Sequence, residues 1–86
     1  MKGNTIPIIL KYVRTQNGYT QKQIGEILNT TQQQIWKYES ENPKTSQEIP
    51  VRHIITLAKL YNVSADYLLG LTDVPEPYPR SEDVND

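Results

Sequence analysis

The chain of 86 residues contains no cysteine and a single histidine, His53. Without cysteine it can form no disulfide bond and no thiolate metal site, and a cytoplasmic location fits this composition. One histidine and scattered carboxylates offer too few ligands for a metal ion, so we expect neither a metal nor a cofactor. No apolar run approaches the roughly 20 residues of a membrane-spanning helix, so we expect no contact with a membrane.

The arrangements typical of enzymes are also lacking. No glycine-rich phosphate loop follows a strand, and no pair of carboxylates lies on an apolar helix face. His53 has no acidic residue three or four positions away and lies on the polar side of a predicted helix, where we expect a surface residue. The sequence therefore offers no candidate catalytic residue and no evident site for a small molecule, and we expect a protein that is not an enzyme.

Positive charge is scarce in the chain as a whole, which has a formal net charge of −1. Its distribution is uneven. Residues 1–71 hold eight lysines and arginines against five acids, whereas residues 72–86 hold one arginine against five acids. The body therefore carries +3 and can contact phosphate, while the tail carries −4. Three prolines accompany the acids of the tail, so we expect one domain over residues 1–72 and a disordered tail over residues 73–86.

Apolar periodicity and capping residues predict five helices and no strand, which is an all-α fold. Glycines are expected to end the first and fifth helices in the left-handed conformation, at Gly18 and Gly70. The predicted helices run from Thr5 as N-cap to near Gln16, from Thr20 as N-cap to Asn29, from Thr30 or Thr31 as N-cap to Glu39, from Pro50 to Asn62, and from Ala65 to about Leu69.

The second and third predicted helices form the most informative stretch, residues 20–39. Gly25 lies in the middle of a helix, where glycine costs up to about 1 kcal/mol relative to alanine. We explain this cost by the close approach of another helix backbone, as a tight helix-turn-helix requires. Asn29, which tolerates the left-handed conformation, ends the second helix. The two helices are therefore expected to meet in a sharp corner.

The outward face of the third predicted helix is rich in amide groups. Ile35 and Tyr38 point inward, and the residues left on the outward face and its flanks are Gln32, Gln33, Gln34, Trp36 and Lys37. A glutamine amide matches the N7 and N6 edge of adenine in the major groove, and a lysine can contact guanine or phosphate. A glutamine run is also common on a solvated face; its position directly after a two-helix corner is what favours DNA recognition.

Many positions match a known family, and they are spread from Ile6 to Asp73. They are Ile6, Leu10, Val13, Arg14, Gly18, Tyr19, Thr20, Gln21, Ile24, Leu28, Thr31, Gln32, Ile35, Lys37, Tyr38 and Glu39, then Ile49, Pro50, Leu57, Ala58, Lys59, Asn62, Val63, Ser64 and residues 66–73. In this pattern the chain resembles the phage-repressor and Cro-like, or Xre-like, helix-turn-helix family. Residues 30–33 are similar to the recognition helix of a lambdoid phage repressor. Gly25 stands where the family usually has alanine, and Asn29 where it has glycine.

The resemblance implies a compact five-helix, lambda-repressor-like domain with the helix-turn-helix at its second and third helices. It also implies a sequence-specific DNA-binding transcriptional regulator, acting as a repressor, that binds double-stranded DNA as a homodimer. The implied base-reading residues are Gln32, Gln33, Gln34 and Lys37. The implied contacts to the DNA backbone or its flank are Thr20, Gln21, Thr31, Trp36 and Lys44. Relatives carry a structural ion pair at the positions of Arg14 and Glu39.

Several alternatives remain open at the level of the sequence. The same fold could serve as a protein-interaction module of the antitoxin or anti-repressor type, with the acidic tail binding a partner. Trp36 could contact DNA sugar or a thymine methyl, pack against the following loop, or contact a protein. Ile8 and Tyr12 could be peripheral packing or a subunit contact. Candidate dimer contacts are Ile8, Tyr67, Leu68 and Leu71.

Overall fold

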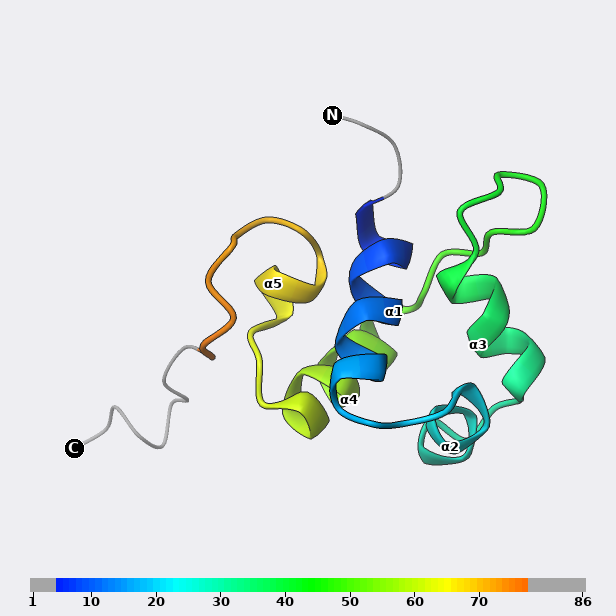
Figure 1. The fold of residues 1–86 in the computed structure, drawn as a ribbon, viewed down its shortest axis with the longest axis horizontal. Helices are drawn as coiled ribbons and strands as arrows, with labels where there is room; N and C mark the ends of the chain where they lie inside the picture. Colours follow the sequence, from blue (N-terminus) through cyan, green and yellow to red (C-terminus); the bar gives the residue numbers. More distant parts are fainter. Residues whose placement is uncertain (1–4, 78–86) are drawn as a thin grey trace.

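A computed structural model of the chain describes residues 5–77, which form five α-helices and no strand (Figure 1). The predicted all-α, five-helix fold is thus confirmed over these residues. None of the five is long and apolar enough to span a membrane. The helices are α1 (Thr5–Gln16), α2 (Gln21–Ile27), α3 (Gln32–Glu39), α4 (Val51–Tyr61) and α5 (Ala65–Leu68).

Helix α1 lies at the centre of the fold (Figure 1). It contacts α3 on one side and α5 on the other, and α5 also packs against α4. Helices α2 and α3 pack mainly against each other and form a corner at one end of the molecule. The arrangement leaves the outward side of this corner uncovered by any other helix.

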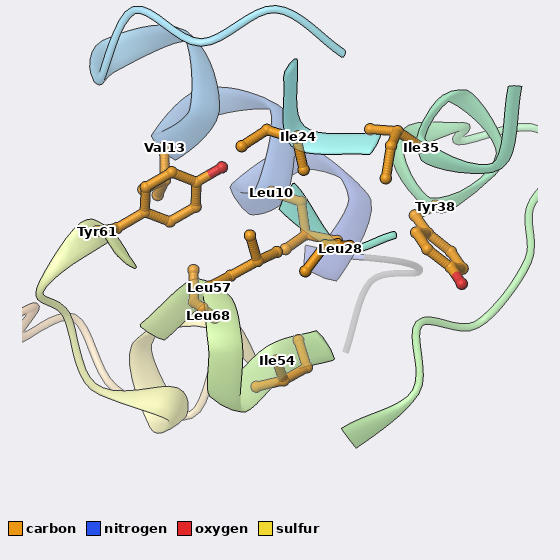
Figure 2. Close-up of a cluster of buried hydrophobic side chains, with 10 residues drawn as sticks. All are labelled: Leu10, Val13, Ile24, Leu28, Ile35, Tyr38, Ile54, Leu57, Tyr61 and Leu68. Atoms are coloured by element: carbon orange, nitrogen blue, oxygen red, sulfur yellow. The ribbon is translucent and has the colours of Figure 1, made fainter. Parts of the chain in front are cut away.

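The core lies where the five helices meet (Figure 2). Each helix contributes to it, and full burial of one such side chain stabilises the fold by about 1.5–3 kcal/mol. Ile35 and Tyr38 are buried as predicted. Ile27 is 43% exposed, although it lies on α2 only three residues after the buried Ile24. The core side chains are Leu10, Val13, Ile24, Leu28, Ile35, Tyr38, Ile54, Leu57, Tyr61 and Leu68.

Helix ends follow local hydrogen bonding. Thr20 and Gln23 form the predicted capping box: the Thr20 hydroxyl accepts from the Gln23 N–H at 3.0 Å, and the Gln23 side-chain oxygen accepts from the Thr20 N–H at 2.8 Å. Thr31 is the N-cap of α3, and Ser64 is the N-cap of α5. Thr5 differs from its predicted role, since it is already the first residue of α1. Both glycines expected at helix ends, Gly18 and Gly70, have positive φ.

Two predictions about exposure are wrong. His53 is only 8% exposed, and its ring is tilted against that of Tyr38 with the centroids 6.1 Å apart. The start of α4 lies under the end of α3, so a neighbouring helix covers the side that the periodicity assigns to solvent. Leu68 is fully buried and therefore cannot be a dimer contact, whereas Ile8 and Leu71 are 50% and 72% exposed.

The chain after α5 turns back toward the connection between α4 and α5. The Ser64 N–H donates to the Pro75 carbonyl at 2.9 Å, and the Val74 N–H donates to the Thr72 hydroxyl at 3.1 Å. Residues 73–77, the start of the predicted tail, thus lie against the helical body. The disorder expected over residues 78–86 lies outside the described residues.

Candidate nucleic-acid interface

The corner between α2 and α3 is fixed by backbone contacts. A Cβ atom on Gly25 would lie 3.0 Å from the carbonyl carbon of Thr31 and 3.1 Å from its oxygen. The Gly25 carbonyl also accepts from the Thr30 N–H at 2.7 Å. Asn29 has a φ of +59°, the left-handed conformation that reverses the chain between the helices. The predicted reason for a mid-helix glycine is therefore present, and α3 has a defined direction relative to α2.

The first residues of α3 project from this corner. The Thr31 hydroxyl accepts from the Gln34 N–H at 3.0 Å, which fixes where the helix begins. Gln32 and Gln33 are exposed, and together with Gln21 and Trp36 they line a shallow open hollow of about 300 Å³. Neither α2 nor α3 has an acidic residue in its first turn. Both helix N-termini therefore keep their partial positive charge available to an anion such as a DNA phosphate.

Trp36 is 43% exposed on this face. Its indole lines the same hollow as Gln21, Gln32 and Gln33, and no residue of the 40–50 loop lines that hollow. This position puts a large planar side chain beside the amides at the start of α3.

Gln34 lies on the other side of α3. Its Nε2 donates to Oε1 of Gln47 at 2.7 Å, and both side chains border a second hollow of about 460 Å³ that is floored by Tyr38 and His53. The three consecutive glutamines are thus divided, with Gln32 and Gln33 on one side of the helix and Gln34 toward the following loop.

Lys37 is half-buried near the end of α3, and its carbonyl accepts from the N–H groups of Ser40 and Gln47 at 3.3 and 3.0 Å. Lys44 is exposed in the loop, where its N–H donates to the Asn42 side-chain oxygen at 2.9 Å. Two exposed acids, Glu41 and Glu48, belong to the same loop and reduce its positive charge.

A buried ion pair ties α1 to the end of α3. Arg14 donates from Nε to Glu39 Oε2 at 2.7 Å and from Nη2 to Glu39 Oε1 at 2.9 Å, and its Nη1 donates to the Tyr19 carbonyl at 2.8 Å. The hydrogen bonds to Glu39 raise the pKa of Arg14, so the cation is firmly held. Removing one partner of such a buried pair typically costs about 3–5 kcal/mol, because the other charge loses its compensation.

Gln21 joins this network. Its Nε2 donates to Glu39 Oε1 at 3.1 Å, and the same residue lines the hollow beside Gln32. Through this hydrogen bond Glu39, at the end of α3, holds the side chain of Gln21 at the start of α2. The sequence indicates Gln21 as a candidate DNA contact. It does not indicate that Glu39, 18 positions away, is the hydrogen-bond partner of Gln21.

Gln47 is the residue of this candidate interface that the sequence does not indicate. It lies in a polar loop without periodicity, 13 positions from Gln34, so neither spacing nor composition connects the two. The one feature of the sequence that could have indicated Gln47 is its place in the loop that directly follows the amide-rich helix. Among residues 5–77, no group of three or more histidines and acids lies close enough together to hold a metal ion.

The chain is similar to a known protein family and to two curated proteins. Residues 8–74 match the model of a family described as a helix-turn-helix domain. Two curated proteins of Bacillus subtilis (strain 168) are similar: the uncharacterized HTH-type transcriptional regulator YobD, 37% identical over 68 residues, and the HTH-type transcriptional regulator ImmR, 40% identical over 67 residues. The alignments cover 79% and 76% of this chain but 57% and 48% of the relatives, so the chain spans about half their length. No solved structure matches the chain significantly.

The family match covers most of the helical body, including the α2–α3 corner and all five helices apart from the first residues of α1. The resemblance to the Xre-like family that the sequence indicates is thereby confirmed. The chain belongs to the helix-turn-helix domain family.

Proposed function

We propose that this chain is the DNA-binding unit of a transcriptional regulator that acts as a repressor and reads the major groove of double-stranded DNA with α3. The observation that carries the proposal is the joint exposure of Gln32 and Gln33 at the start of α3, beside a corner fixed at Gly25. An α-helix fits the major groove, and the first residues of a recognition helix are those that reach base edges. The two relatives named as transcriptional regulators support the same role.

In this proposal, different residues of the interface contact the bases and the DNA backbone. Gln32, Gln33, Gln34 and Lys37 contact base edges. Contacts to the sugar-phosphate backbone come from residues around the two helix N-termini and the loop, where exposed N–H groups and Lys44 attract phosphate. The backbone and flank contacts are Thr20, Gln21, Thr31, Trp36 and Lys44.

A homodimer completes the proposal. One recognition helix contacts only a few base pairs, which gives too little discrimination among genomic sites. Two copies on a two-fold symmetric site would double the contacts, with half-site centres about 34 Å apart or a multiple of that distance. Ile8 and Leu71, both exposed, are candidate contacts between the copies. A cytoplasmic location belongs to the same proposal, since the DNA of a bacterial regulator lies there.

Selection of bound sites from a random pool of double-stranded DNA tests this function. We expect the full chain to enrich a two-fold symmetric site. Its affinity for that site should fall steeply with salt, with a slope of log K against log salt near −0.9 for each phosphate neutralised. A pool that stays random, or an affinity that does not respond to salt, would contradict the proposal and favour a protein-interaction module of the antitoxin or anti-repressor type.

A further inference from the structure

The loop after α3 is organised by its own hydrogen bonds. The Asn42 carbonyl accepts from the N–H groups of Thr45 and Ser46 at 2.9 and 2.8 Å, and the Asn42 side chain accepts from the Lys44 N–H. The hydroxyls of Ser40 and Thr45 are also hydrogen-bonded to each other. These contacts give the loop a defined shape before any contact with α3 is considered.

Gln47 attaches this loop to α3 at two points. Its backbone N–H donates to the Lys37 carbonyl at 3.0 Å, and its side-chain Oε1 accepts from Nε2 of Gln34 at 2.7 Å. The two points lie about one helical turn apart on α3, since Gln34 and Lys37 are three residues apart. Gln47 is therefore held by its backbone at a fixed place, from which its amide can orient the amide of Gln34.

The hydrogen bond determines what Gln34 can offer to DNA. A glutamine amide reads adenine with its oxygen and one N–H in a fixed plane. Because one N–H of Gln34 is directed to the loop, its Oε1 and its second N–H are left in a single orientation. Gln32 and Gln33 line the other hollow, and no residue of the loop after α3 lines it with them. The loop therefore orients the amide of Gln34 and not those of Gln32 and Gln33.

We propose that Gln47, which lies outside the helix-turn-helix, is a specificity-determining positioning residue that holds the Gln34 amide in one orientation for base recognition. The inference rests on the proposed DNA-binding function. It assigns Gln47 no contact with a base: the loop residue acts through Gln34. Orientation before binding favours one pairing of donors and acceptors over the alternatives, so its loss relaxes the base preference at the position that Gln34 faces.

Three substitutions test the inference in the full chain. Gln47→Met keeps the length of the side chain and removes the acceptor. Gln47→Glu is the matched control, because it keeps an acceptor oxygen for Gln34 and adds a negative charge. Gln34→Ala marks the base pair that Gln34 reads. Base preferences are measured by selection and by affinities for single-base variants of the selected site, and thermal unfolding checks that each variant is folded.

We expect Gln47→Met to lose about fivefold or more of its discrimination at the base pair identified by Gln34→Ala, and nowhere else. Gln47→Glu should bind every site more weakly while keeping the wild-type preference, because its added charge repels phosphate. In the Gln34→Ala background, Gln47→Met should have no further effect on base preference.

Two results would overturn the inference: a wild-type preference at every position in folded Gln47→Met, or additive effects of the two substitutions. Either result leaves the proposed function intact, because the wild-type chain has then selected a site. If the wild-type chain selects no site, the proposed function fails, and a role of Gln47 in specificity fails with it.

Discussion

His53 is the residue through which we expect the stability of the fold to depend on pH. It is the only histidine of the chain and lies buried against Tyr38, on the inner side of α3. Burial, together with the positive charge of Arg52, lowers the pKa of His53 below its ordinary 6.5. The other titratable groups that border the same hollow are Tyr38, Glu48 and Arg52.

The sign of the pH effect follows from this lowered pKa. The unfolded chain binds a proton near pH 6.5, whereas the folded chain binds it only at lower pH. The contribution of neutral His53 to stability is therefore complete above about pH 6.5 and is lost as the pH falls toward the folded-state pKa. We expect the free energy of unfolding, measured by urea denaturation, to decrease between pH 7.5 and pH 5.5.

His53→Gln provides the control for this prediction. The variant cannot titrate in this range, so the slope of its stability against pH should be much flatter than that of the wild type, whatever its absolute stability. Equal slopes for the two proteins would show that His53 is not the group responsible.

Residue-level chemistry was predictable from the sequence where partners are close along the chain. Thr20, Thr31 and Ser64 cap helices because each hydroxyl meets an N–H three positions later. The amide contacts of Gln21 and Gln34 depend on partners 18 and 13 positions away, which only the packing of α2, α3 and the loop brings near. The burial of His53 has the same origin, since α3 and not α4 itself covers it.

At the scale of elements, the contact between α2 and the α2–α3 turn sets the direction of α3. The backbone of Thr31 lies within 3.1 Å of the position that a Cβ on Gly25 would occupy, so a larger side chain must push the turn away. The hydrogen bond from the Thr30 N–H to the Gly25 carbonyl opposes that shift. Geometry at residue 25 thus controls how α3 is presented.

We expect Gly25→Val to lower the free energy of unfolding by about 1–3 kcal/mol, because overpacking a tight contact costs this amount. Gly25→Ala is the matched control: its gain in helix propensity, up to about 1 kcal/mol, offsets much of a smaller displacement. Urea denaturation followed by circular dichroism measures both. Wild-type stability in Gly25→Val would mean that the turn moves freely and that this contact does not fix the corner.

The existence of all five helices was predictable because apolar periodicity and a cap at one end or the other agree in each of them, such as Gly18 after α1 and Asn62 after α4. Their boundaries were less so. Helix α2 ends at Ile27, two residues before the predicted end at Asn29, because the sharp corner begins there. The conformation of residues 40–49 was not predictable, since a polar loop has no periodicity and its order depends on Asn42 and on contacts with α3.

At the scale of the whole molecule, the net charge is −1, but residues 1–71 carry a net positive charge. Five of the chain's ten acids follow residue 71, while the first turns of α2 and α3 contain none. The interface therefore keeps two positive helix ends in a chain that is acidic overall. The sequence predicted this division of charge, and the packing adds the direction in which the two helix ends point.

Direct base recognition by Gln33 is measured by comparing wild type and Gln33→Ala in the same selection from random double-stranded DNA. Gln33 is exposed at the start of α3, so its removal should leave the fold unchanged. Gln16→Ala, at an exposed position outside α2 and α3, is the matched control and should select the wild-type site.

The outcome is read as base preference and affinity for the wild-type site. Recognition by α3 predicts that Gln33→Ala loses its preference at one base pair in each half-site and binds the wild-type site more weakly by about 1–3 kcal/mol. A folded Gln33→Ala protein that selects the same site with the same affinity would contradict base reading by Gln33.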